Sequence, residues 1–313
     1  MRAVITRSVG RVRHELRVFL SAVRRVTNEY QSAYAVDRWL GVSSLANRQI
    51  RYSALRAAGR GQSEEELVRV SMEYWNKGDR VGVDLKDYSH WQGAGPWRDR
   101  EQWLKLGRPH FRMYERLCLV TSTKRPLRRA VEWGPGGGAN AIHFTDEVDE
   151  FCGIEIAQAS LDECKRVLSE AGFESFRPVL ISAEAPEQAL ELAGSQYDFF
   201  LSTYVFELLP GKRYGERVLS VAYTLLRPGG LAIIQIRYDD GSERSRQKNI
   251  DYYRHAARFT SYSIEEFWTL AQRIGFRPEY VTLVPEHIDE YAGDLYAYFA
   301  LVKPGSEERA REK

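Results

Sequence analysis

The chain has 313 residues, of which 43% are hydrophobic and 28% charged, and its formal net charge is +2. This composition supports one full-sized buried core with an appendage and excludes a partner recognised through overall charge alone. No apolar run reaches the roughly 18 residues of a membrane-spanning helix. Three cysteines without CxxC spacing predict core thiols in a reducing cytoplasm, and the excess of arginine over lysine favours a bacterial source.

Residues 1–60 are expected to form a basic helical arm. They carry twelve arginines, no lysine and three acids, whereas the rest of the chain is mildly acidic. Apolar residues recur at alternating intervals of three and four, which predicts an amphipathic helix over residues 9–26. We expect this helix to pack on its own domain or on a second copy in a homodimer. Contact with an anionic membrane surface is an alternative, and nucleic acid is the least favoured partner.

Residues 61–120 are expected to form a helical cap and lid. Ser63 is followed by three glutamates, a pattern typical of a helix N-cap with acids in the first turn. An aromatic segment follows around a Gly-Ala-Gly-Pro turn, with His90 and Trp91 as candidate substrate-binding residues. This segment either closes the site as a lid, or its tryptophans fix the N-terminal helices to the sheet. A helix is expected over residues 104–120.

Residues 131–140, VEWGPGGGAN, combine the end of an apolar strand, an acid and a glycine-rich turn. Glycine permits positive φ and close approach of the backbone to a ligand, and a loop that opens a helix offers unpaired N–H groups. Glu132 lies just before the loop. A carboxylate there would repel a pyrophosphate but can accept a hydrogen bond from an ammonium group.

At these residues the chain resembles the class I S-adenosylmethionine-dependent methyltransferases, whose first motif is an acid followed by GxGxG. The resemblance covers about residues 128–304. It implies a Rossmann-like α/β fold whose sheet is mostly parallel, with seven strands and an antiparallel edge, preceded here by a helical extension. The α/β alternation predicts helices over residues 138–144, 159–170, 186–192, 214–226 and 263–274.

The resemblance also implies an S-adenosylmethionine site outside the carboxyl ends of the strands. Glu155 would hold the ribose hydroxyls, and the end of the third strand would contact the adenine. The expected cofactor-binding residues are Glu132, Gly134, Gly136, Gly138, Glu155, Ile156, Ser182, Ala183, Glu184 and Thr203.

Methyl transfer requires an aligned acceptor, removal of its proton where the acceptor is a hydroxyl, and exclusion of water. The candidate catalytic residues are Glu207, His255 and Asp239, and Tyr204 would line the acceptor channel. His90 is a further candidate base. Glu207 is alternatively a helix-start carboxylate in water.

A magnesium site is a further possibility at three acids. Glu207, Asp239 and Asp240 offer the oxygen ligands that Mg²⁺ prefers, as in the similar metal-dependent sugar methyltransferases of this fold. Two adjacent aspartates before a glycine are alternatively a turn.

The predicted function is O-methylation of a small-molecule or glycan hydroxyl. An RNA or protein methyltransferase docking through the basic arm, and a catalytically silent binding protein of the same fold, remain alternatives. The predicted organisation is a basic helical arm (1–60), a helical cap and lid (61–120), an S-adenosylmethionine-binding domain (121–305) and a charged tail (306–313).

Overall fold

A computed structural model of the chain describes residues 53, 55, 61–77, 86, 89–243, 245–285 and 295–305. The chain divides into two compact units, Met1–Gln62 and Ser63–Lys313. The predicted amphipathic helix and the charged tail lie outside the described residues. Their proposed roles in dimerisation or membrane contact therefore stay predictions.

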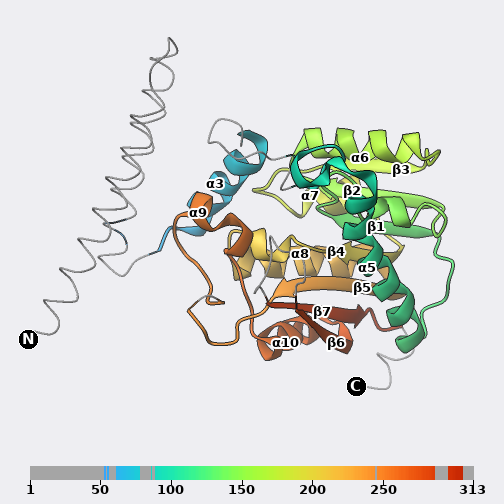
Figure 1. The fold of residues 1–313 in the computed structure, drawn as a ribbon. Helices are drawn as coiled ribbons and strands as arrows, with labels where there is room; N and C mark the ends of the chain where they lie inside the picture. The colour runs from blue at the N-terminus through green and yellow to red at the C-terminus, as the bar shows by residue number, and fades with distance from the viewer. Residues whose placement is uncertain are drawn as a thin grey trace, which may run out of the picture. The chain divides into compact units, whose positions relative to one another are not determined.

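The second unit is built around one seven-stranded sheet in the order β3-β2-β1-β4-β5-β7-β6 (Figure 1). The parallel strands are β1 (Arg129–Trp133), β2 (Glu150–Glu155), β3 (Phe176–Leu180), β4 (Tyr197–Ser202) and β5 (Leu226–Arg237). The strands β7 (Leu295–Val302) and β6 (Arg277–Pro285) complete one edge in antiparallel pairing. The Rossmann-like sheet with its antiparallel edge is confirmed.

Helices pack on both faces of the sheet, and the strands are buried accordingly (Figure 1). Successive strand residues point to opposite faces, so Ala130 joins one hydrophobic cluster and Val131 the other. The helices of one cluster are α5 (Arg100–Val120) and α6 (Gln158–Glu170). Those of the other are α7 (Gln188–Leu192), α8 (Lys212–Leu225) and α10 (Ile264–Ile274).

The cap begins where the sequence predicts it. The Ser63 hydroxyl accepts a hydrogen bond from the Glu66 backbone N–H at 3.2 Å and starts α3 (Glu64–Lys77). This helix lies beside α9 (Tyr252–His255), although about 180 residues separate the two in the chain (Figure 1). The Trp75 indole N–H donates to the Tyr252 hydroxyl at 3.0 Å, which joins the two helices.

The helix predicted over residues 138–144 is largely absent. Only a 3-10 turn, η3 (Ala141–His143), forms there. Gly138 has φ +85°, outside the helical region, and the turn closes through bonds that span three residues, from His143 to Asn140 and from Phe144 to Ala141. The glycine loop therefore leads into a tight turn that holds Asn140 beside the first strand.

The cysteines Cys118, Cys152 and Cys164 are buried free thiols, as predicted. Within the described part of the chain, none of the helices has the length and apolarity that a bilayer crossing requires.

Candidate active site

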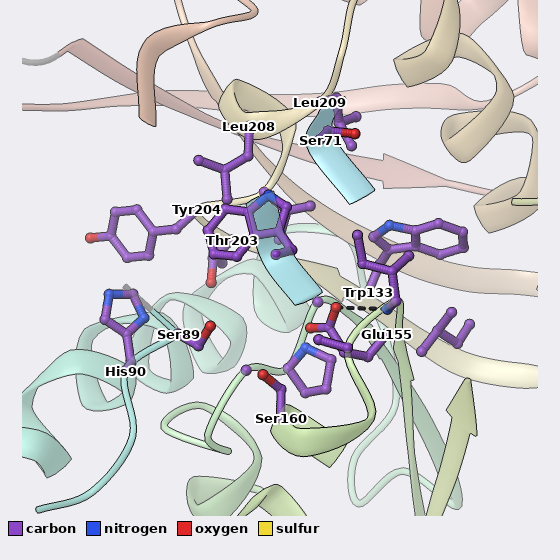
Figure 2. A pocket seen from close by; sticks show the side chains of 18 of the residues that line it. Ser71, Ser89, His90, Trp133, Glu155, Ser160, Thr203, Tyr204, Leu208 and Leu209 are labelled. Carbon is purple, nitrogen blue, oxygen red and sulfur yellow. Dashed lines mark hydrogen bonds between the residues drawn. The ribbon is translucent and has the colours of Figure 1, made fainter. Parts of the chain in front are cut away.

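A cavity opens at the carboxyl ends of β1, β2 and β4, where the strand order reverses between β1 and β4 (Figure 2). Ligands of open α/β sheets bind at such switch points because the loops on either side diverge there. The wall is contributed by the glycine loop, the strand ends, the lid segment, α3 and α9. Among the predicted site residues, those that line it are Gly134, Gly136, Glu155, Ile156, Ala183, Thr203, Tyr204 and His90.

The glycine loop is held tightly against the lid segment. A Cβ atom on Gly136 would lie 2.5 Å from the Ser89 carbonyl oxygen, and Gly136 has φ +52°. The Gly137 backbone N–H donates to the same carbonyl at 2.7 Å. Glycine is thus needed here for the approach of a second backbone, in addition to the turn itself.

The aromatic segment packs on α5 and also contributes to the cavity wall, and its role as a lid stays a prediction. Trp97 and Trp103 are buried, and the Trp103 indole N–H donates to the His90 carbonyl at 2.7 Å, which anchors the segment on α5. Ser89 and His90 line the cavity. Trp91 is placed differently from the prediction, because its ring covers Gly137 and is not part of the cavity wall.

Glu132 is buried below the glycine loop, and burial raises the pKa of its carboxyl group to about 8. Its Oε1 accepts a hydrogen bond from the Asn140 amide at 2.6 Å. Its Oε2 is buried without a hydrogen-bond partner among the described residues. The carboxyl group is therefore mostly protonated at pH 7 in the ligand-free protein, and a bound ammonium group would stabilise its ionised form.

Asn140 links Glu132 to the neighbouring strand and to α5. Its amide group also donates to the Thr203 hydroxyl at 2.8 Å, so both amide hydrogens are used. The Asn140 carbonyl oxygen then accepts from Nδ1 of His110 at 2.8 Å, and Nε2 of His110 is hydrogen-bonded to the Tyr298 hydroxyl at 3.0 Å. This network fixes the orientation of the residues around Glu132.

Glu155 ends β2 and faces the cavity opposite Leu208 and Ser71 (Figure 2). It accepts a hydrogen bond from the Ile156 backbone N–H at 2.7 Å. Burial raises the pKa of its carboxyl group to about 6, while hydrogen bonds from backbone N–H groups oppose that rise. It therefore remains predominantly ionised at neutral pH and suits a pair of ribose hydroxyls.

Four predicted cofactor residues lie outside the cavity wall: Glu132, which is buried below the glycine loop, and Gly138, Ser182 and Glu184. Glu184 is exposed, and its backbone N–H donates to the Ser182 hydroxyl at 3.2 Å. The Ser182 backbone N–H is bound by the Gln188 side chain at 2.8 Å. Gly138 packs against Cys164, where a Cβ atom would lie 3.1 Å from the sulfur. Of the predicted third-strand residues, only Ala183 reaches the cavity.

His90 and Tyr204 occupy the other side of the cavity with their rings edge to face, 5.7 Å between centroids (Figure 2). Both residues have left-handed backbone conformations, with φ +54° and +56°, which non-glycine residues adopt at a cost and which concentrate at functional sites. Burial, together with the nearby His110, lowers the pKa of His90 to about 4. His90 is therefore neutral at pH 7, and in the ligand-free protein it is a weaker base than an ordinary histidine.

The predicted catalytic acids do not reach the cavity. Glu207 is buried beneath it, and its backbone carbonyl accepts hydrogen bonds from the Phe259 and Thr260 N–H groups. Asp239 and Asp240 both accept from the Ser245 hydroxyl, at 2.8 and 2.6 Å, and form the turn that the sequence offered as the alternative. His255 on α9 is not part of the wall either.

The magnesium prediction gains no support. Glu207, Asp239 and Asp240 do not come together, and the described residues contain no group of three carboxylate, imidazole or thiol side chains arranged to hold a metal ion.

The sequence pointed to neither His110 nor Asn140 nor the residues of α3 and α9 that line the cavity. These residues come from segments that are far apart in the sequence, and they meet only in the folded chain. One signal was available, because Gly107 lies three residues before His110 in a long helix, where glycine is unfavourable unless something packs against it.

Comparisons with known proteins agree with this geometry. Residues 107–281, more than half of the chain, match a family model described as a methyltransferase domain. No curated protein matches significantly.

Solved structures with a similar fold were also found. A S-adenosylmethionine-dependent methyltransferase from Methanosarcina mazei is 11% identical, with 59% of this chain and 97% of that chain covered and a TM-score of 0.46. The YcgJ protein from Bacillus subtilis is 12% identical, with 66% and 100% covered and a TM-score of 0.45. A phosphoethanolamine N-methyltransferase from Haemonchus contortus is 15% identical, with 56% and 49% covered and a TM-score of 0.42. By its family match, its sheet and its motif, the chain belongs to the class I S-adenosylmethionine-dependent methyltransferases.

Proposed function

We propose that the protein methylates a hydroxyl oxygen of a small molecule or sugar. The observation that supports this proposal most directly is that one cavity joins the cofactor residues to His90 and Tyr204. The cavity is bounded by α3, the lid segment and α9, which favours an acceptor small enough to be surrounded.

The residues present suit S-adenosylmethionine. Glu132 offers a carboxyl oxygen without a partner among the described residues, which an ammonium group would stabilise in its ionised form, and Glu155 offers acceptors for the ribose hydroxyls. When bound, this cofactor supplies an electrophilic methyl group on a positively charged sulfur. The protein has then to position the acceptor and to keep water out.

His90 is the residue of this site best suited to take a proton from the acceptor hydroxyl. Its ring lies in the cavity wall beside Tyr204, and its backbone is fixed by the bond from Trp103 to its carbonyl. Tyr204 contacts the His90 ring, and the Tyr204 backbone N–H is held by the buried Gln235 side chain at 2.6 Å. Both rings are therefore positioned before an acceptor arrives.

The test measures binding of S-adenosylhomocysteine by calorimetry and then turnover of S-adenosylmethionine with three probes. The probes are β-naphthol, methyl β-glucoside and benzylamine. We expect cofactor-product binding and methylation of a hydroxyl probe. Methylation of benzylamine alone would contradict an oxygen acceptor, and absence of S-adenosylhomocysteine binding would contradict the cofactor. Steeply salt-dependent RNA binding would favour the alternative of a polymeric acceptor.

A matched pair of variants tests His90. His90→Gln keeps a polar side chain but cannot take the proton, so we expect kcat to fall by about 10²–10⁴-fold with unchanged affinity for S-adenosylhomocysteine. His143→Gln is the control, because His143 lies outside the cavity wall and bonds to the Leu104 carbonyl at 2.9 Å. Equal kcat values in the two variants would remove His90 from the mechanism.

A further inference from the structure

The outer wall of the cavity, defined here as Ser71, Trp75, Leu208 and Tyr252, lies away from the strand ends that hold the cofactor residues. Ser71 and Trp75 come from α3, Tyr252 comes from α9, and Leu208 ends the turn η4 (Phe206–Leu208). Figure 2 shows Leu208 and Ser71 on the side of the cavity opposite Glu155. The outer wall therefore bounds the cavity on the side away from the carboxylate assigned to the ribose.

The donor groups of the outer wall are all bonded to other protein groups. The Ser71 hydroxyl donates to the Val68 carbonyl at 2.8 Å. The Trp75 indole N–H donates to the Tyr252 hydroxyl, which in turn donates to the Leu208 carbonyl. The surfaces that remain for a ligand are the carbon faces of the rings and the Leu208 side chain.

Charged side chains are almost absent from the cavity. Its lining within the described residues includes one carboxylate, Glu155, and no lysine or arginine. A phosphate, carboxylate or ammonium group on the acceptor would lose its hydration without gaining a counter-ion. A sugar would lose hydrogen bonds to water at several hydroxyls, because the donor groups of the outer wall are already bonded within the protein.

Resting on the proposed function, we infer that the acceptor is an uncharged aromatic hydroxyl compound, a phenol or naphthol, and not a sugar. Its flat apolar body packs against Trp75, Tyr252 and Leu208, where aromatic pairs gain from offset or edge-to-face contact. Its single hydroxyl faces the side of the cavity that carries His90 and Tyr204.

The experiment measures acceptor binding to the full-length protein saturated with S-adenosylhomocysteine. β-Naphthol and methyl β-glucoside are titrated separately, and binding is followed by ligand-detected NMR. We expect β-naphthol to bind at least tenfold more tightly than the glucoside. Tighter binding of the glucoside, or saturation by neither compound up to millimolar concentration, overturns the inference while S-adenosylhomocysteine binding leaves the proposed function standing.

Variants of the outer wall test whether the aromatic compound binds there. Trp75→Ala should lower the affinity for β-naphthol at least fivefold. Trp75→Phe should retain most of that affinity because it keeps an aromatic ring. Leu208→Asn, which adds unpaired polar atoms, should also weaken it. Trp268→Ala is the matched control, since Trp268 is another half-buried tryptophan but lies on α10 outside the cavity.

Affinity for S-adenosylhomocysteine reports whether each variant is folded. With that affinity intact, equal β-naphthol binding in Trp75→Ala, Leu208→Asn and Trp268→Ala overturns the assignment of the outer wall.

Discussion

Glu155 is the residue on which the ribose assignment depends. Glu155→Ala should weaken binding of S-adenosylhomocysteine by about 1–3 kcal/mol, because charge-assisted hydrogen bonds to the ribose are lost. Glu184→Ala is the control, since Glu184 is an exposed acid outside the cavity wall and should leave the affinity unchanged. Calorimetry measures the affinity of both variants for S-adenosylhomocysteine. An affinity equal to that of the wild type in Glu155→Ala contradicts the assignment of Glu155 to the ribose.

Glu132 should make the stability of the ligand-free protein depend on pH. Its pKa is about 8 in the folded state, against an ordinary value of 4.5, so the folded state holds a proton that the unfolded state has released. This contribution to stability is complete below pH 4.5 and is lost as the pH rises through 8. Denaturant unfolding between pH 6.5 and 8 should show the free energy falling by up to about 1.4 kcal/mol per pH unit.

The range from pH 6.5 to 8 separates the titration of Glu132 from that of the other two groups, because Glu155 has a pKa of about 6 and His90 a pKa of about 4. Glu132→Gln should flatten the pH dependence between 6.5 and 8, whereas Glu155→Gln should leave it in place. A wild-type slope that survives in Glu132→Gln would show that the carboxyl group is already ionised in the folded protein.

Among the elements, α5 shapes the site from a distance. A Cβ atom on Gly107 would lie 2.0 Å from the Ala139 carbonyl oxygen, so the helix rests directly on the glycine loop and brings His110 to Asn140. Glycine to alanine normally stabilises a helix by about 0.5–1 kcal/mol. Here we expect Gly107→Ala to destabilise the protein by about 1–3 kcal/mol and to weaken S-adenosylhomocysteine binding, because the helix and loop must separate.

Denaturant unfolding and calorimetry measure both effects of Gly107→Ala. Lys105→Ala is the control on the same helix, since Lys105 is exposed and should change neither quantity appreciably. Stabilisation by Gly107→Ala would show that the contact between α5 and the loop is not maintained.

The elements themselves were predictable where local patterns specify them. The helix expected over residues 263–274 forms as α10, because a capping box at Ser263 and Glu266 specifies its start. The helix expected over residues 138–144 was mispredicted. A single 3-10 turn buries its apolar residues Ala141 and Ile142 instead. Periodicity over so few residues does not separate a turn from a helix.

In the whole molecule, the part of the site made by strand ends could be predicted and the part made by packed side chains could not. Parallel strands bring their carboxyl ends to one edge, so Glu155 and Ala183 reach the cavity whatever their neighbours are. The bonds from Tyr298 through His110 to Asn140 join three elements across 188 residues, and no spacing in the sequence encodes them. Tyr252 likewise reaches the cavity wall only because α9 packs against α3, which is distant from it in the sequence.

The origin of the outer wall has a consequence for how this protein diverges from its relatives. Trp75 belongs to α3, which precedes the seven-stranded sheet in the chain. The end of the cavity that carries Glu155 is formed by the ends of the strands. Selection for a new acceptor can act on Ser71 and Trp75 of this helix without changing the strand ends. Relatives that share residues 131–156 but differ at Ser71 and Trp75 are therefore expected to have different product spectra, and exchanging that helix between two such enzymes should exchange their selectivity.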